Sequence, residues 1–432
     1  MIGAMKESKK QNILFKVLCC MTSLFLILNC QSVWQNAINH NYHIYEFTLF
    51  FIILLCVYSI FNFKTSKKKL EKFKVISIFY LFIIVVLLIL SVSLSNWIRF
   101  LSRFLSFPII LLFFFSNLKQ KEKQYIFYCF INWVSIIAWI TFVLWLFSSL
   151  GIIHQTGVIQ VNWFGDYSNY FNLYFSSPYQ MIDFINIGLR RNIGIFTEGP
   201  MFMIVLSFAL MLMLLINDNY KISRFKIIGM VLAMLSTASI TGYLIMAIIG
   251  AYIFIKNKKY IGLMLNIEKK FNIDKRYIKY IYKGLMIICV LLIIVIIFLK
   301  KDTASFHARF DDYITGLKCW MVSPLWGNGY ENIEFLRQFM SDSRSWNIGF
   351  SNTVFAVLAY GGVLFAVPFV YPILEGLKHS VRTKNWNVTI VCFIYILLYF
   401  TVIFYTFYIN FFIWSYLICL NKNILKECKK NV

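Results

Sequence analysis

Long apolar runs separated by short polar segments dominate this chain. Several runs reach the roughly 20 residues with which a helix crosses about 30 Å of hydrocarbon. Lysines and arginines gather in short clusters between the runs, an arrangement that keeps basic loops in the cytoplasm. The pattern therefore predicts an all-α polytopic membrane protein of about 12 transmembrane helices, with both termini cytoplasmic. The expected spans are 12–30, 46–63, 75–94, 98–117, 125–148, 199–216, two within 227–255, 284–299, 351–374 and two within 388–420.

Two of the apolar runs are each expected to form two short helices. The run 227–255 has a basic cluster at each end, and a single helix would place one cluster outside. Two helices that turn near Ser236–Thr241 keep both clusters inside, and 388–420 divides in the same way. Short spans are tolerated where neighbouring helices bury them. The segment 256–283, which holds nine Lys and Arg residues, is predicted to be a basic cytoplasmic loop on anionic lipid.

Composition leaves little material for a separate soluble domain. The chain is 60% hydrophobic and 14% charged, whereas soluble domains are about 45–50% apolar and about 25% charged. We therefore expect one membrane domain over residues 1–432. The net charge of +24 could suit nucleic acid. Because the basic clusters lie between spans and account for topology, we expect no nucleic-acid partner.

No metal or cofactor is expected from the sequence. The ten cysteines lie mainly in apolar runs, without CxxC spacing or a disulfide framework. His307 has no second ligand at a suitable spacing. The chain also has no P-loop, GxGxxG or HExxH motif, so ATP hydrolysis and dinucleotide chemistry are unsupported.

Two long outer loops, 149–197 and 300–350, interrupt the apolar rhythm. Both carry acids and arginines together with Tyr, Trp and Asn. Such a surface suits sugars and phosphates, because aromatic rings stack on sugar rings and arginine binds phosphate through two donors.

The end of the first loop places charge directly against an apolar run. Arg190 and Arg191 precede the span 199–216, and Glu198 stands at its expected start. Charge at a membrane edge is costly unless it faces water, a partner or a ligand. The arginines either bind an anionic ligand or reach lipid headgroups. Glu198 either caps the helix dipole, or orients Arg191 or acts as a base.

The second loop opens with Arg309, Asp311 and Asp312 on a predicted helix over 309–321. This segment is either part of a binding site or a solvated loop helix. A turn that contains Gly327 and Gly329 follows, and glycine lets backbone approach a ligand closely.

Arg99 and Arg103 lie four residues apart, on one face at the outer end of the span 98–117. They depart from the positive-inside pattern. They either bind an anionic ligand or anchor the helix at the membrane interface.

These segments resemble the motifs of the O-antigen polymerase and ligase superfamily. The R-x-x-G-x-F-x-E-P signature of that family is similar to the stretch Arg191-x-x-Gly194-x-Phe196-x-Glu198, although Gly199 precedes Pro200 in this chain. The stretch 235–243 resembles the family's L-S-x-S-R-x-G turn, with Ile240 in place of the basic residue. Two later stretches are also similar to family motifs: Arg309 with Pro324-Leu325-x-Gly327-x-Gly329, and Ser351-Asn352 with Tyr360-Gly361-Gly362.

The resemblance implies a GT-C-like helical fold with its active site on the outer face of the bacterial cell (inner) membrane. It implies a glycosyltransferase that polymerises undecaprenyl-diphosphate-linked oligosaccharide repeat units for capsule, O-antigen or exopolysaccharide, without a metal. Arg191 would bind the diphosphate with Arg190 in support, and Arg309 would hold the second phosphate or the acceptor. The general base stays open among Glu198, Asp311 and Asp312. Further substrate-binding residues are expected at Arg99, Arg103, Gly327, Gly329 and Asn352.

Two alternatives remain beside the polymerase. A ligase would transfer the glycan to another acceptor, but ligases resemble a pattern with histidine where this chain has Ser351. A flippase of lipid-linked oligosaccharide would line its cavity with charge at mid-membrane depth, and such charge is scarce here. The expected partners are the lipid-linked oligosaccharides, membrane lipids, a flippase and a chain-length regulator.

Overall fold

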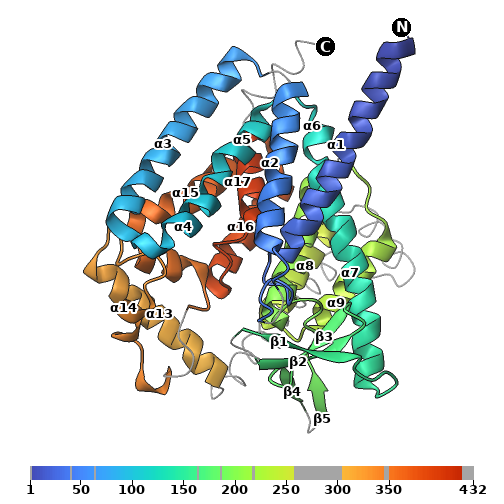
Figure 1. The fold of residues 1–432 in the computed structure, drawn as a ribbon, viewed down its shortest axis with the longest axis vertical. Helices are drawn as coiled ribbons and strands as arrows, with labels where there is room; N and C mark the ends of the chain where they lie inside the picture. Colours follow the sequence, from blue (N-terminus) through green and yellow to red (C-terminus); the bar gives the residue numbers. More distant parts are fainter. Residues whose placement is uncertain are drawn as a thin grey trace, which may run out of the picture.

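The computed structural model describes residues 2–38, 41–62, 65–162, 165–184, 187–216, 219–256, 304–344 and 350–420. Most of these residues are helical (Figure 1). Six apolar helical segments are long enough to cross a membrane: Ile44–Phe61, Lys67–Ser91, Leu94–Phe115, Gln120–Ser149, Gly199–Ile216 and Thr353–Thr383. A multi-pass membrane protein is the class that this arrangement supports. The predicted span 284–299 and the basic loop beyond Lys256 lie outside the described residues, so the total of twelve spans stays a prediction.

The described helices follow the predicted apolar runs closely. The N-terminal half contains α1 (Ile2–Leu28), α2 (Ile44–Asn62), α3 (Lys67–Ser91), the 3-10 turn η1 (Leu94–Asn96), α4 (Trp97–Phe104), α5 (Ser106–Phe115), α6 (Gln120–Lys123) and α7 (Tyr125–Ser149). The part of the chain after the first long loop contains α8 (Gly199–Ile216), α9 (Arg224–Ser236), α10 (Ile240–Lys256), α13 (Ala304–Val322), α14 (Ile333–Arg337), η2 (Asp342–Arg344), α15 (Thr353–Thr383), α16 (Trp386–Thr401) and α17 (Tyr408–Cys419).

Both predicted pairs of short helices are confirmed. Helix α9 ends at Ser236 and α10 begins at Ile240, so the turn falls where the basic clusters required it. The second run divides into α16 and α17. Neither α9 nor α17 exceeds 13 residues, which corresponds to about 20 Å at 1.5 Å per residue.

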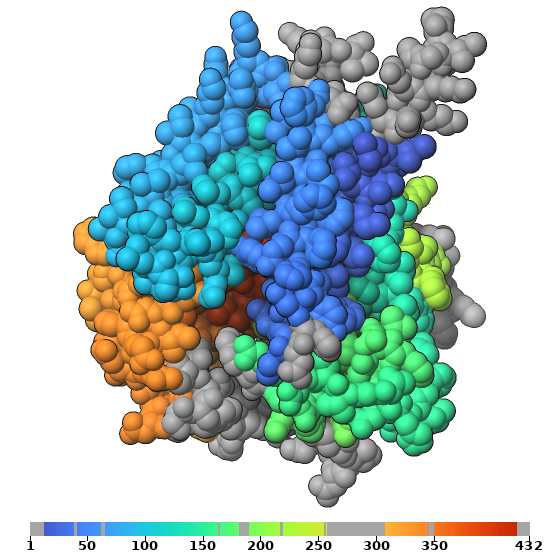
Figure 2. All heavy atoms as spheres, in the orientation of Figure 1, coloured from blue at the N-terminus to red at the C-terminus, as the bar shows by residue number. Residues whose placement is uncertain are grey.

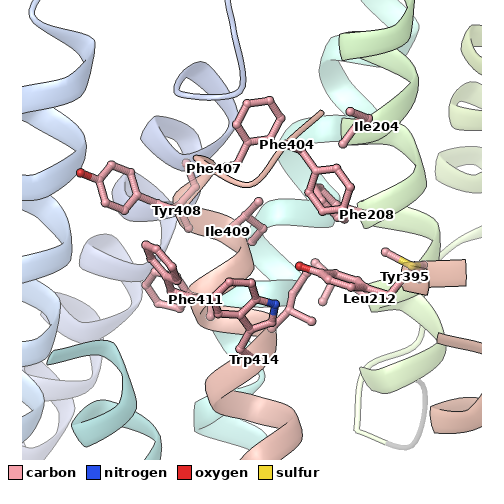
Figure 3. Packing of buried hydrophobic residues seen from close by; sticks show 14 of the residues in the cluster. Ile204, Phe208, Leu212, Tyr395, Phe404, Phe407, Tyr408, Ile409, Phe411 and Trp414 are labelled. Atoms are coloured by element: carbon pink, nitrogen blue, oxygen red, sulfur yellow. The ribbon is translucent and has the colours of Figure 1, made fainter. Parts of the chain in front are cut away.

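Helices α8 and α17 form the centre of the bundle. Almost every residue of α8 and all of α17 are buried, as expected for helices that are apolar on every side. Figure 3 shows Phe208 of α8 beside Tyr395 of α16 and Phe404 of the α16–α17 turn. Their ring centroids lie 6.0 and 5.5 Å from that of Phe208. The short helices are thus shielded by protein, the condition under which a short span is tolerated.

The first outer loop is not helical, and the all-α prediction is wrong there. It folds into a three-stranded antiparallel sheet of β1 (Gly157–Val161), β2 (Gly165–Tyr170) and β3 (Tyr174–Ser176), and a hairpin of β4 (Met181–Phe184) and β5 (Ile187–Arg190). The sheet packs Val161 and Tyr167 against Val33 of the α1–α2 connection, which makes a second, small core. Strands of three to six residues within a polar loop give too few alternations for the sequence to reveal them.

The two long loops, 149–197 and 300–350, lie at one end of the bundle in their described parts. In Figure 1 the five strands, α13 and α14 occupy the bottom of the view, whereas the N-terminal end of α1 is at the top. We call the bottom the loop end and the top the basic end. The path of the chain places the basic clusters at the start of α3, around α6 and at the last turn of α15 at the basic end.

Candidate functional site

Arg191 is clamped to the turn between α9 and α10. Its Nε donates to the carbonyl oxygen of Thr237 and its Nη2 donates to that of Ala238, both at 3.0 Å. The neighbouring Asn192 donates from its backbone N–H to the carbonyl of Ser236 at 3.0 Å. The last carbonyls of a helix lack partners within that helix, so these donors complete the end of α9. The structure therefore joins two of the motifs that the sequence showed only as separate stretches.

Arg309 makes the corresponding contact at the second pair of short helices. It projects from α13, and its Nη1 donates to the carbonyl oxygen of Thr401, the last residue of α16, at 3.2 Å. The hydroxyl of Tyr313, one turn further along α13, donates to the carbonyl of Phe400. Each site arginine thus caps the end of a short helix at the loop end of the bundle.

Glu198 precedes the first residue of α8 and is under the influence of both positive charges. Its backbone carbonyl accepts from the N–H groups of Met201 and Phe202 in the first turn of α8. Within the described ranges of the chain, its carboxylate has no hydrogen-bond or ion-pair partner. Burial raises the pKa of Glu198 above the ordinary value, and the positive charges of Arg191 and Arg309 oppose that rise.

The same three charges also act on Arg191. Burial lowers the pKa of the Arg191 guanidinium, the carboxylate of Glu198 raises it, and Arg309 lowers it. Two loops far apart in the sequence therefore place two cations and one unpaired carboxylate in one neighbourhood. Of the sequence candidates, Arg191 and Glu198 of the first loop share this electrostatic neighbourhood with Arg309 of the second loop.

Gly199 explains how this cluster is packed. A β-carbon at this position would lie 3.2 Å from the carbonyl oxygen of Thr237 and 3.5 Å from Nε of Arg191. The first residue of α8 therefore lies directly against the clamp. Gly199, which departs from the family pattern, therefore stands where a side chain would crowd the contact between Arg191 and Thr237.

Arg190 is directed elsewhere. It ends β5, is exposed, and donates from Nη1 to Oγ of Ser176 in β3 at 3.2 Å. Its carbonyl accepts from the indole N–H of Trp145 at 2.7 Å. Because successive side chains of a strand point to opposite faces, Arg190 fastens the sheet and does not join Arg191.

Asp312 and Asp311 belong to an ion network around Arg344. Nη1 of Arg344 lies 2.6 Å from Oδ1 of Asp312 and 3.5 Å from Oδ2 of Asp311, and it also donates to the carbonyl of Ala308 at 2.7 Å. The second oxygen of Asp312 accepts from the N–H of Ser351 at 2.8 Å. Burial raises the pKa of Asp312, and these donors oppose the rise. With its acceptors occupied, Asp312 is suited to holding α13 in place.

Arg344 is the residue that sequence reasoning did not single out. It stands among many polar residues of the second loop, and no spacing connects it with Asp312. Arg344 binds residues on both sides of Arg309 in the sequence: the carbonyl of Ala308 and the carboxylates of Asp311 and Asp312.

Arg99 and Arg103 contact a carboxylate of the protein. Nη1 of Arg103 lies 3.3 Å from Oε1 of Glu331 and donates to the hydroxyl of Tyr330 at 2.5 Å, and Arg99 lies 3.4 Å from Oε2 of Glu331. The hydroxyl of Tyr405 donates to the same carboxylate at 3.4 Å. These contacts attach the second loop to α4. Figure 2 shows the surface hollowed where the cyan, orange and blue segments meet over red C-terminal atoms.

The glycine turn of the second loop packs on a kink in α15. Gly327 has a φ of +70°, and a β-carbon there would lie 2.4 Å from the backbone N of Gly361. Backbone hydrogen bonds join Gly329 to Tyr360 at 3.2 Å and Pro324 to Val363 at 2.8 Å. The close approach that the sequence predicted is therefore made to the protein's own backbone.

Asn352 is the N-cap of α15. Its Oδ1 accepts from the N–H of Phe355 at 2.9 Å. Its Nδ2 is buried and has no partner among the residues that the structure describes. The observed contact is thus a helix cap, a role that asparagine commonly fills.

Comparison with known protein families, with curated proteins and with solved structures finds no match. The family resemblance therefore depends on the motif residues themselves. The contacts of Arg191 join the first motif to the 235–243 turn, and the charge of Arg309 from the third motif acts on Glu198.

Proposed function

We propose that this protein is a membrane glycosyltransferase that polymerises oligosaccharide repeat units carried on undecaprenyl diphosphate, at the outer face of the cell membrane. The observation that carries the proposal is the surroundings of Glu198: Arg191 packs against the adjacent Gly199, and the positive charges of both Arg191 and Arg309 act on the Glu198 carboxyl group. Two fixed cations suit a diphosphate, and a carboxylate without a partner suits a hydroxyl that must lose its proton.

The depth of the cluster supports a lipid-linked donor. Helices α9 and α16 have 13 and 16 residues, which correspond to about 20 and 24 Å, less than the roughly 30 Å of a hydrocarbon core. Both start at the basic end, and in the proposed orientation helices of this length would end short of the opposite membrane surface. The two arginines at those ends are placed to meet a phosphate that is attached to a membrane lipid.

The proposed reaction needs one bond broken and one bond formed. The bond between C1 of the terminal sugar and the diphosphate oxygen breaks through an oxocarbenium-like state, as in glycoside chemistry generally. The acceptor hydroxyl of the next lipid-linked unit bonds to C1, and its proton passes to the carboxylate of Glu198. The electron pair leaves with the diphosphate, and the remaining donors of Arg191 and Arg309 stabilise that charge. One fixed donor at a developing charge is typically worth about 3–4 kcal/mol.

Arg191→Lys, Arg191→Ala and Glu198→Gln test the proposal when they replace the wild-type protein in a host that lacks it. Surface glycan and lipid-linked intermediates are resolved by size. We expect single repeat units to accumulate in all three variants, with protein still in the membrane. Arg190→Ala is the matched control, because it removes the adjacent arginine, which binds Ser176 instead; it should keep long polymer.

The same measurement separates the alternatives. Normal long polymer in the Arg191→Ala variant would contradict the assignment. Long polymer that stays on its lipid carrier in the variants would indicate a ligase. Single units trapped on the inner face would indicate a flippase and would remove the catalytic roles of Glu198 and both arginines.

A further inference from the structure

A polar cavity lies at the basic end of the bundle, opposite the arginine cluster. The ends of α10, α15 and α16 line an open cavity of about 610 Å³, within the range of about 300–1,000 Å³ that is common for small-ligand sites. Its described lining includes two lysines, one histidine and several neutral polar groups, and no Asp or Glu is among those residues. The cavity is therefore suited to an anion.

The ammonium of Lys256 is held in position within this cavity. Its Nζ donates to Oδ1 of Asn387 at 2.8 Å and lies 5.7 Å from the ring centroid of Tyr252. The hydroxyl of Tyr252 donates to the same Oδ1 at 2.6 Å. An ammonium carries three N–H donors, so Lys256 keeps donors for a ligand while its position is fixed.

Lys384 brings the second positive charge. It follows the last turn of α15 in the left-handed conformation, with a φ of 53°, and lines the cavity together with Thr383 and Asn385. Lys384 lies at the end of α15, whereas Lys256 lies at the end of α10. Two cations on separate elements can thus flank one anionic group.

The position of Trp386 indicates that the cavity lies at headgroup depth. This residue lines the cavity at the start of α16 and is 66% exposed, and exposed tryptophans gather at membrane–water interfaces. Ile390 lines the cavity one turn later, and Phe393, on the same helix face, is 56% exposed. An apolar track therefore leads from the cavity along α16.

We propose that this cavity binds the phosphate group of an anionic membrane lipid, with Lys256 and Lys384 on the phosphate and the acyl chains along Trp386, Ile390 and Phe393. Basic pockets between helices on the cytoplasmic side of membrane proteins recognise anionic headgroups in this way. Free phosphate shares the same chemistry, but it has no acyl chain that could lie along the apolar track. The inference is independent of the reaction proposed for the opposite end.

The test uses the purified full-length protein in neutral detergent micelles. Phosphatidylglycerol, phosphatidylcholine and inorganic phosphate are titrated separately while the melting temperature is followed. The structure predicts stabilisation by phosphatidylglycerol alone. In Lys256→Gln/Lys384→Asn, the apparent affinity for phosphatidylglycerol should fall roughly thirtyfold, which is the typical contribution of two lysines near an anionic lipid. Asparagine is chosen because it tolerates the left-handed backbone at 384.

Lys67→Gln/Lys74→Gln is the matched control. It removes two exposed lysines of α3, outside the cavity, and should bind phosphatidylglycerol like the wild-type protein. Equal loss in both double variants, or wild-type affinity in the cavity variant, would overturn the proposal. Full stabilisation by inorganic phosphate alone would show that the bound phosphate group does not need to belong to a lipid.

Discussion

Arg344 and Asp312 form a buried ion pair in which Nη1 and Oδ1 lie 2.6 Å apart, one helical turn from Arg309. The side chains are 5% and 1% exposed. Asp312 also accepts from the backbone of Ser351, just before α15. The pair thus connects α13, the helix that carries Arg309, to the start of α15.

We expect Arg344→Met to destabilise the protein strongly, because it leaves Asp312 buried without its cation. Removing one partner of a buried pair typically costs about 3–5 kcal/mol. The melting temperature in detergent measures the loss. Asp312→Leu in the same background should recover part of it, since the uncompensated charge is then removed. A double variant as unstable as the sum of the two single variants would contradict a direct pair.

Glu198→Gln should make the protein more stable at neutral pH. Because burial raises the pKa of Glu198, its protonated form favours the fold, and that stability is lost as the pH rises through the raised pKa. Glutamine cannot lose a proton, so the variant avoids this cost. The difference in melting temperature from the wild-type protein should vanish below the ordinary glutamate pKa of about 4.3. A difference in melting temperature that stays the same at every pH would contradict a raised pKa of Glu198.

The pH dependence of activity should follow the same group. As a base, Glu198 must be ionised, so the rate should fall on the acid side at a higher pH than an exposed glutamate would require. Arg309→Gln removes a charge that opposes the rise in pKa. In that variant the acid limb of the residual activity should move to still higher pH. An unmoved limb would mean that another group sets it.

Gly327→Ala should disrupt the second loop. The left-handed backbone costs a residue with a side chain about 1–3 kcal/mol, and the new β-carbon would also overlap the backbone of Gly361. Limited proteolysis of the loop would report the damage. Gly250→Ala is the control, because a β-carbon there meets nothing within 4 Å, and its cleavage pattern should match that of the wild-type protein.

Arg103 and Glu331 give a test between a ligand site and an attachment of the second loop. If the pair only attaches the loop to α4, Arg103→Ala and Glu331→Ala should lose stability and activity together. The exchange Arg103→Glu/Glu331→Arg should then restore part of both. A different result would indicate that Arg103 binds the substrate. In that case Arg103→Ala would lose activity at normal stability, and Glu331→Ala would behave like the wild-type protein.

Apolar periodicity and the placement of charge were sufficient to predict most helices of this protein. A membrane-length apolar run has few structural alternatives, because backbone polar groups in hydrocarbon must be satisfied within the helix. The turn between α9 and α10 followed from basic clusters at both ends of one run. The strands of the first loop were missed, because strands of three to six residues give too few alternations of apolar and polar residues to be recognised.

The sequence by itself determined the helical membrane class, the short helix pairs and the polar residues among which a site had to be sought. Only the tertiary structure decided which of those residues act together. The charges of Arg191, Glu198 and Arg309 act on one another across loops far apart in the chain, whereas the adjacent Arg190 binds Ser176 and Asp312 pairs with Arg344. The physical reason is that periodicity is a local property of the chain. Long-range packing decides whether a guanidinium lies beside a carboxylate or a carbonyl, and the residues next to it in the sequence do not reveal that packing.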